Sequence, residues 1–221
     1  MDVYLEVGRK RTFACAIEWP GWSRSGRDAA DALEALVAYG GRYRKTLGAS
    51  ATRGLTLPKT GDALRVAQRV KGNATTDFGA PSITPDADRR SLDDDELARQ
   101  IAILRASWKA FDRTAKRHAR ATLRTGPRGG GRSLTKIVAH VLEADRAYLS
   151  GLGGKFRAAT STNEATELRA AFVDMLERRA NGETPALGPR RTKPLWTPRY
   201  TVRRSAWHVL DHVWEIEDRA G

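Results

Sequence analysis

The sequence predicts an α+β fold in two units: a small N-terminal α+β domain with an antiparallel sheet and a helix (residues 1–90), and a four-helix bundle (residues 91–221). Near the N-terminus apolar residues alternate with others, as in β-strands. In the C-terminal part they recur every three or four positions, as in amphipathic helices. Residues 73–91 are rich in Thr, Gly, Pro and Asp, which predicts a linker and a domain boundary near Arg90.

The N-terminal unit is expected to begin with a strand over Val3–Val7 that buries one face. Its other predicted elements follow in chain order: a tight turn at 8–11, a strand at 13–17, a helix capped by Asp28 and closed by Gly40 and Gly41, and a strand at 64–70. Together these elements predict a sheet covered by one helix. Cys15 is expected in the core of this unit, and Trp19 and Trp22, near a turn, are expected to pack against the helix bundle and not to serve as exposed contacts.

The C-terminal unit is expected to hold four amphipathic helices with one long crossover between the last two. The predicted elements are a helix capped by Ser91 or Asp93 and running past Ala115, a break at 126–131, a helix capped by Ser133, a helix at 162–179, a crossover at 185–199, and a helix at 201–219. Facing helices of such a bundle direct side chains toward one another, which suits a metal site in its core.

The net charge of +13 is large and is not confined to a tail. Residues 113–132 hold seven basic residues and no acid, and residues 190–204 hold six and no acid. Such stretches attract nucleic acid, an anionic small molecule or an acidic protein surface, although they are equally typical of a solvated, arginine-rich surface. No helix-turn-helix, zinc-finger or RNA-binding signature accompanies them, so nucleic acid is an unfavoured partner.

The single cysteine cannot form an internal disulfide, and no apolar run approaches the ~20 residues that a bilayer crossing needs. The N-terminal residues alternate and carry early charge, unlike a signal peptide. We therefore expect a cytoplasmic protein with no membrane association.

Three of the four histidines suit a metal site: His140 on one predicted helix, and His208 and His212 on the last. A four-residue gap places both imidazoles of the last helix on one face, a turn apart. Two ligands from one helix and a third from a neighbour leave a coordination position open, as in catalytic sites. The alternative is that these histidines are hydrogen-bonded core residues, because H-x-x-x-H pairs are frequent on helices.

Several other residues are candidates around these histidines. Glu143, Asp211 and Glu215 lie close by helical spacing and are candidate acceptors that would fix an imidazole tautomer. Trp207 and Trp214 would wall the site from water. The fourth histidine, His118, lies in a basic stretch and is expected at the surface.

Residues 134–149, which read LTKIVAHVLEADRAYL, resemble the second helix of DinB-like proteins, where an apolar helix with one histidine supplies the first metal ligand. Residues 203–219, which read RRSAWHVLDHVWEIEDR, resemble the last helix of that bundle with its paired ligands. The resemblance covers roughly Asp93 to the end. It implies a DinB-like four-helix bundle in which His140, His208 and His212 hold a divalent metal.

The family resemblance also implies a chemistry. Characterised DinB-like enzymes include transferases and isomerases that use mycothiol, bacillithiol or glutathione, and their metal lowers the pKa of the thiol. Three neutral nitrogens suit several transition metals, and we expect zinc or nickel. Arg199, Arg203 and Arg204 would bind an anionic thiol or small-molecule substrate. A second copy of the chain, in a homodimer, is a further candidate partner. No separate catalytic nucleophile is identified.

Residues 13–36 weakly resemble the strand, turn and helix of HicB-type antitoxin domains, which implies a fold for this unit and not an antitoxin function. Two functional hypotheses result. The first is a metal-dependent thiol S-transferase, or a related metalloenzyme, with an added α+β domain. The second is a non-enzymatic binding module whose basic surface holds nucleic acid or a protein partner.

Overall fold

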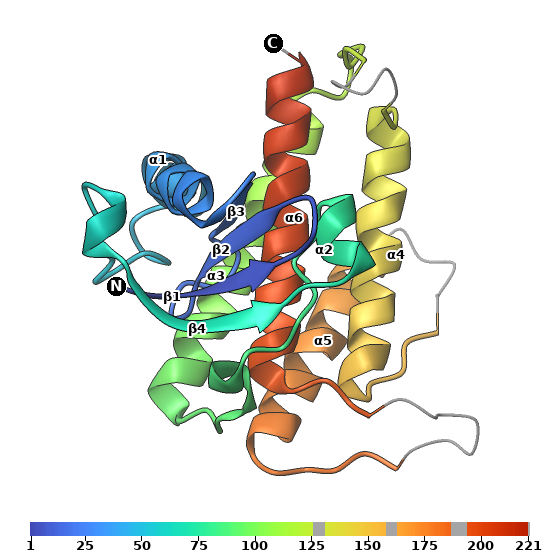
Figure 1. The fold of residues 1–221 in the computed structure, drawn as a ribbon. Helices are drawn as coiled ribbons and strands as arrows, with labels where there is room; N and C mark the ends of the chain where they lie inside the picture. Colours follow the sequence, from blue (N-terminus) through green and yellow to red (C-terminus); the bar gives the residue numbers. More distant parts are fainter. Residues whose placement is uncertain (126–130, 158–162, 187–193, 221) are drawn as a thin grey trace.

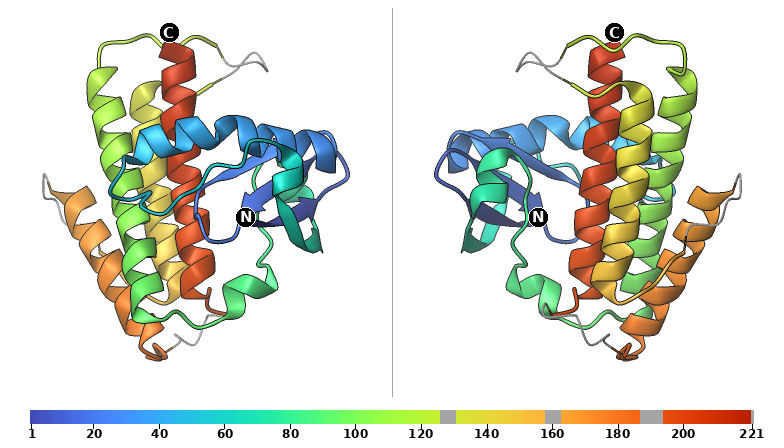
Figure 2. Two further views of the ribbon diagram at one scale, coloured as in Figure 1. Left: turned by 90° about the vertical axis from the view of Figure 1, so that its left-hand side faces the viewer. Right: turned by 90° about the vertical axis from the view of Figure 1, so that its right-hand side faces the viewer.

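The computed structural model describes residues 1–125, 131–157, 163–186 and 194–220 (Figure 1). It has a mixed α/β architecture, with a four-stranded sheet in the N-terminal part and most of the helices in the C-terminal part. In Figure 2 the sheet and helix α1 (Ala29–Leu47), which joins its third and fourth strands in the chain, lie on one side of the four long helices. No helix in these described ranges has the length and apolar character to cross a bilayer.

The sheet has the order β3-β2-β1-β4. Its strands are β1 (Asp2–Val7), β2 (Thr12–Ala16), β3 (Ser23–Gly26) and β4 (Arg65–Lys71). The first three form antiparallel pairs, but β4 runs parallel to β1. The prediction of an antiparallel sheet was therefore wrong in part. The helix between β3 and β4 returns the chain to the far edge of the sheet, and such crossovers produce parallel pairs.

Strand β1 is buried on both faces, whereas one buried face was predicted. Val3 and Leu5 join the main core, and Tyr4 and Glu6 on the opposite face are also buried. Tyr4 belongs to a small second cluster that includes Trp207 from the C-terminal part. Alternation in the sequence cannot reveal that a distant segment covers the second face of a sheet.

Helix α1 (Ala29–Leu47) is capped as expected by Asp28, whose side chain accepts the N–H of Asp31. It does not end at Gly40 and Gly41 but continues to Leu47. A Cβ atom on Gly40 would lie 2.8 Å from the ring of Trp22, so glycine allows the helix to approach this fully buried indole. Gly40 therefore serves close packing within the helix.

The stretch predicted as a linker contains short ordered elements. They are α2 (Ala74–Phe78) and the 3₁₀ turn η2 (Asp86–Arg89); a further turn, η1 (Gly61–Ala63), precedes β4. Asn73 and Thr76 form a capping box at the start of α2, and Gly79 ends it in the left-handed conformation. Elements this short show no hydrophobic periodicity in the sequence, so only their capping residues could have predicted them.

The four long helices are α3 (Asp94–Arg117), α4 (Leu134–Leu152), α5 (Glu164–Ala180) and α6 (Pro198–Ala220). Asp93 and Ser133 cap α3 and α4 as predicted. Helix α6 contacts all three other long helices, and α4 also contacts α5. Most of the glycine-rich break and the middle of the predicted crossover, at 126–130 and 187–193, lie outside the described residues.

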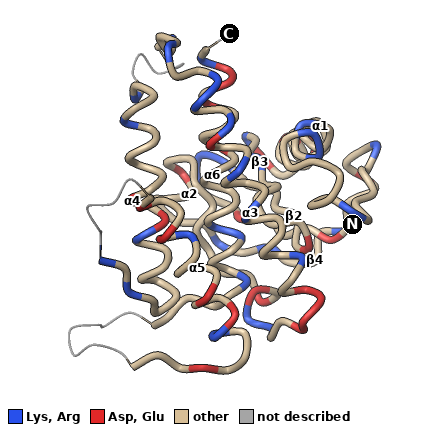
Figure 3. The backbone as a smooth tube through the Cα atoms, turned by 180° about the vertical axis from the view of Figure 1, so that it is seen from behind, with Lys and Arg blue, Asp and Glu red and all other residues tan. Residues whose placement is uncertain are grey.

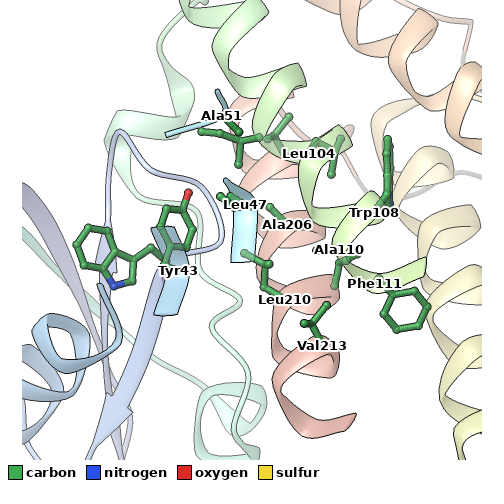
Figure 4. Packing of buried hydrophobic residues seen from close by; sticks show 14 of the residues in the cluster. Tyr43, Leu47, Ala51, Leu104, Trp108, Ala110, Phe111, Ala206, Leu210 and Val213 are labelled. Atoms are coloured by element: carbon green, nitrogen blue, oxygen red, sulfur yellow. The ribbon is translucent and has the colours of Figure 1, made fainter. Parts of the chain in front are cut away.

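The N-terminal and C-terminal parts share one continuous hydrophobic core. In Figure 4, Leu47 of α1 lies beside Ala206 and Leu210 of α6, and Tyr43 of α1 belongs to the same cluster. Gly21, in the turn before β3, has a φ of 88° and lies against Leu210, where a Cβ would be 2.8 Å from the leucine side chain. Helix α6 is thus buried between the sheet unit and the other long helices, which fixes the direction of its side chains.

Candidate metal centre

Three histidines converge where α4 faces α6. The Nε2 atoms of His140 and His208 are 3.1 Å apart, and one nitrogen from each of the three rings lies within 4.8 Å of the others. His208 and His212 lie one turn apart on the same face of α6, and their ring centroids are 4.6 Å apart. A tetrahedral zinc ion with Zn–N bonds of about 2.0–2.1 Å holds its nitrogens roughly 3.3 Å apart. These three side chains can therefore hold a metal ion.

The protonation of the cluster suits ligation. His208 and His212 are only 7% and 8% exposed. Burial, together with the neighbouring histidines, lowers the pKa of His208 to about 2. Burial and the nearby Arg132 also lower the pKa of His140. The imidazole rings of His208 and His140 are consequently neutral at physiological pH, which leaves nitrogen lone pairs for a cation.

The cluster is also poorly satisfied by the protein itself. Within the described residues, Nδ1 of His208 is buried and has no hydrogen-bond partner. Its Nε2 meets another imidazole, and two neutral imidazoles share at most one proton between facing nitrogens. A cation between the facing Nε2 atoms of His140 and His208 would use both of their lone pairs, whereas Nδ1 of His208 is not the atom that faces the cluster.

Glu215 orients one of the rings. Its Oε2 atom lies 2.7 Å from Nδ1 of His212, which leaves Nε2 of that ring directed to the cluster. The other carboxylate oxygen accepts from Arg219 at 2.6 Å, and Arg219 also donates to the carbonyl of Arg124. These contacts lower the pKa of Glu215, with the hydrogen bond from His212 as the main cause. Carboxylate–histidine pairs of this kind fix the tautomer of metal ligands.

The other two predicted acceptors do not bind the histidines. Glu143 is exposed on α4. Asp211 lines the same cavity as the cluster, but its Oδ1 atom pairs with Arg24 at 3.4 Å. Of the two tryptophans, Trp207 lines the cavity, whereas Trp214 is buried and its indole N–H donates to Thr46 of α1.

The three arginines near the start of α6 have different environments. Arg199 is buried and donates to Glu96 and to the carbonyl of Ser91. Arg203 is buried and pairs with Asp88. Only Arg204 lines the cavity beside the histidines, where its guanidinium lies 4.9 Å from the ring centroid of Trp207.

The histidine cluster opens into a cavity of about 660 Å³. Its walls come from α4, α6, residues 131–132 and, in the N-terminal part, α2 with the two residues that follow it. This volume accommodates a small organic molecule.

Some cavity residues were not singled out as functional from the sequence. Tyr148 lies two turns after His140 on the same face of α4, so helical spacing alone would have found it. Arg132 and Phe78 come from segments outside the long helices, and no local pattern links them to the histidines. The remaining sequence expectations concern His118 and Cys15: His118 caps the end of α3, and Cys15 is fully buried.

The basic residues are not gathered into a single surface. Figure 3 shows Lys and Arg over helices and loops of both parts of the chain, with Asp and Glu among them. Several arginines of the two basic stretches have partners inside the protein, including Arg113 with the carbonyl of Thr46 and Arg124 with the carbonyl of Asp218. Some of the arginines that give the chain its positive charge therefore serve to hold its own segments together by hydrogen bonds.

No family model, no curated protein and no solved structure matches this chain. Assignment of a chemistry consequently rests on the histidine cluster and its cavity.

Proposed function

We propose that this chain is a metalloprotein in which His140, His208 and His212 bind one divalent transition metal. The observation that carries the proposal is the convergence of three imidazole nitrogens within 4.8 Å at the wall of a cavity. Three ligands from two helices leave a coordination position facing that cavity, the arrangement typical of catalytic zinc.

The donor set favours zinc or nickel. Neutral imidazole suits both ions, whereas magnesium and calcium prefer sites built from oxygen ligands. Glu215 supports the proposal because it already accepts from the nitrogen of His212 that does not face the cluster. His140 is the most solvent-exposed of the three histidines.

We further propose that the four long helices form a DinB-like bundle, with α4 supplying the first ligand and α6 the paired ligands. The contacts of α6 with α3, α4 and α5 support this arrangement. The mixed sheet with one covering helix is compatible with the HicB-like resemblance of the N-terminal part, which carries no function here.

The reaction that best fits such a site is transfer or isomerisation with a low-molecular-weight thiol in the cytoplasm. When bound, the metal would lower the pKa of a thiol and supply a thiolate at neutral pH. Arg204 and Arg132 would attract an anionic thiol or substrate into the cavity, and Trp207 and Tyr148 would exclude water beside it.

Metal analysis of protein purified without a histidine tag tests the proposal. We expect about one zinc or nickel ion per chain in the wild type, and loss of this metal in the double variant His208→Ala, His212→Ala. The matched control is His118→Ala, which removes a histidine outside the cluster and should keep its metal. A folded wild type that stays metal-free after incubation with zinc and nickel would contradict the proposal.

A further inference from the structure

The N-terminal part of the chain builds one wall of the cavity that holds the histidines. Thr75, Phe78, Gly79 and Ala80 line it opposite the side chains of α4 and α6. Phe78 is 73% exposed, the highest value among the exposed large hydrophobic residues of the described chain. Ligand pockets are lined mainly by apolar and aromatic side chains, and Phe78 contributes such a side chain to this cavity.

This wall is held in place by a buried carboxylate. Glu6 of β1 is fully buried and accepts hydrogen bonds from the hydroxyl of Thr76 and the backbone N–H groups of Ser82 and Ile83. A carboxylate with three donors inside the protein strongly fixes the segments that carry them. Helix α2 and the residues after it are thereby fastened to the sheet.

Helix α6 holds the same segment from the other side. Arg204 donates to the carbonyl of Pro81 at 2.7 Å, and Tyr200 donates to the carbonyl of Ser82 at 2.9 Å. The helix that carries two of the histidines therefore fixes the position of the wall that faces them. The segment that carries Phe78 is therefore held in place by hydrogen bonds from both the sheet and α6.

The charge balance of the cavity is positive. Arg219 pairs with Glu215, and Asp211 pairs with Arg24, so both lining carboxylates are compensated. Among the described residues, Arg132 and Arg204 line the cavity without an ion pair to a carboxylate. Two guanidinium groups that have no carboxylate partner in the described ranges attract an anion, and a bound divalent metal would add to that field.

The apolar surface of the cavity is aromatic. Tyr148 and Trp207 lie beside the histidines, with the ring centroids of Tyr148 and His208 5.7 Å apart, and Phe78 of α2 also lines the cavity. Several aromatic rings in one cavity favour a ligand with a flat apolar group.

From these observations we infer that the cavity binds a small organic anion with a flat apolar body, and that Phe78 of the N-terminal part contacts that body. This inference rests on the proposed function, since it places the ligand beside the metal. The N-terminal part is then a component of the ligand site, and the substrate class is an aromatic or similarly flat carboxylate or other monoanion.

Binding of para-fluorobenzoate to the zinc-loaded protein, followed by fluorine NMR, tests the inference. Fluoroacetate lacks the ring and para-fluorobenzamide lacks the charge, so we expect each to bind at least roughly fivefold more weakly than para-fluorobenzoate. Phe78→Ala should weaken para-fluorobenzoate by roughly fivefold and leave fluoroacetate unchanged. Arg132→Gln should weaken para-fluorobenzoate by about threefold, and added salt should reduce that difference.

The matched control is Val138→Ala, which removes another exposed apolar side chain, on α4, that does not line the cavity. It should bind para-fluorobenzoate like the wild type. Zinc content is measured on every sample, so absence of zinc from the wild type refutes the proposed function. A zinc-loaded wild type that does not bind para-fluorobenzoate, or binds it equally well after Phe78→Ala, overturns the present inference and leaves the metal site standing.

Discussion

Helix α6 carries two buried polar clusters less than two turns apart, and they differ in how their polar atoms are satisfied. Arg203 donates to Asp88 at 2.8 Å and to the backbone carbonyls of Ala16 and Ile17 at 2.6 and 3.0 Å. His208 and His212 meet a third imidazole, and one nitrogen of His208 has no partner in the described residues.

The difference separates a structural cluster from a candidate binding site. Every nitrogen of the buried Arg203 guanidinium donates within the protein, and Asp88 neutralises its charge, so this cluster joins α6 to β2 and η2. The histidine cluster lies at a cavity and has unused lone pairs, so a cation would satisfy it. The basic residues of one helix thus serve two different purposes.

The largest expected effect comes from breaking the satisfied cluster. Asp88→Ala leaves the buried Arg203 charge without its carboxylate and should lower the free energy of unfolding by about 3–5 kcal/mol. Urea unfolding at neutral pH measures it. Asp211→Ala is the control, because it breaks the more exposed ion pair between Asp211 of α6 and Arg24 of β3, and it should cost less than about 1 kcal/mol. Equal losses in the two variants would contradict the structural role of Arg203.

Asp145 is intermediate between these two clusters in how its polar atoms are satisfied. Its carboxyl group is fully buried, neither oxygen has a hydrogen bond within the described residues, and Nε of Arg169 is 4.0 Å away. Burial raises the pKa of Asp145 to about 7 from a usual value of 3.8. The folded state therefore binds the proton more tightly than the unfolded state, and its stability falls as the pH rises from about 4 to 7.

Asp145→Asn should remove this dependence. We expect the variant to be more stable than the wild type by roughly 2–4 kcal/mol at pH 8, with a much smaller difference at pH 4. Urea unfolding of both proteins at the two pH values measures the change. A difference that is the same at both values would show that Asp145 does not titrate in this range.

A smaller effect is expected at the edge of the histidine cluster. Glu215→Gln removes the carboxylate that orients His212 and should weaken zinc binding by about 10–100-fold without unfolding the protein. Glu143→Gln is the matched control, since Glu143 is exposed on α4, and it should change the affinity by less than about twofold. Competition with a chelator of known affinity measures both. Equal affinities would mean that Glu215 does not support the cluster.

Much of the histidine geometry could be predicted because it is local. The H-x-x-x-H spacing places His208 and His212 on one face, and Glu215 lies three residues after His212, within reach on the same helix. The helix caps Asp28, Asp93 and Ser133 were likewise readable from single residues and their neighbours.

What could not be predicted depends on distant partners. Three arginines near the start of α6 form one basic group in the sequence. In the fold, Arg199 forms an ion pair with Glu96 and Arg203 forms one with Asp88. The second covered face of β1 and the parallel pairing of β4 also arise from segments far along the chain. Helix α2 is too short for periodicity, although its capping box was a local signal.

The most direct test of the central claim is the effect of zinc on stability, because only the unsatisfied cluster should respond to it. A ligand at about 100 times its dissociation constant stabilises the folded state by about 2.7 kcal/mol. We predict a rise of this size for the wild type and for His118→Ala on addition of zinc, and none for the His208→Ala, His212→Ala variant. An unfolding free energy of the wild type that does not change with zinc, or an equal rise in the double variant, would contradict the account.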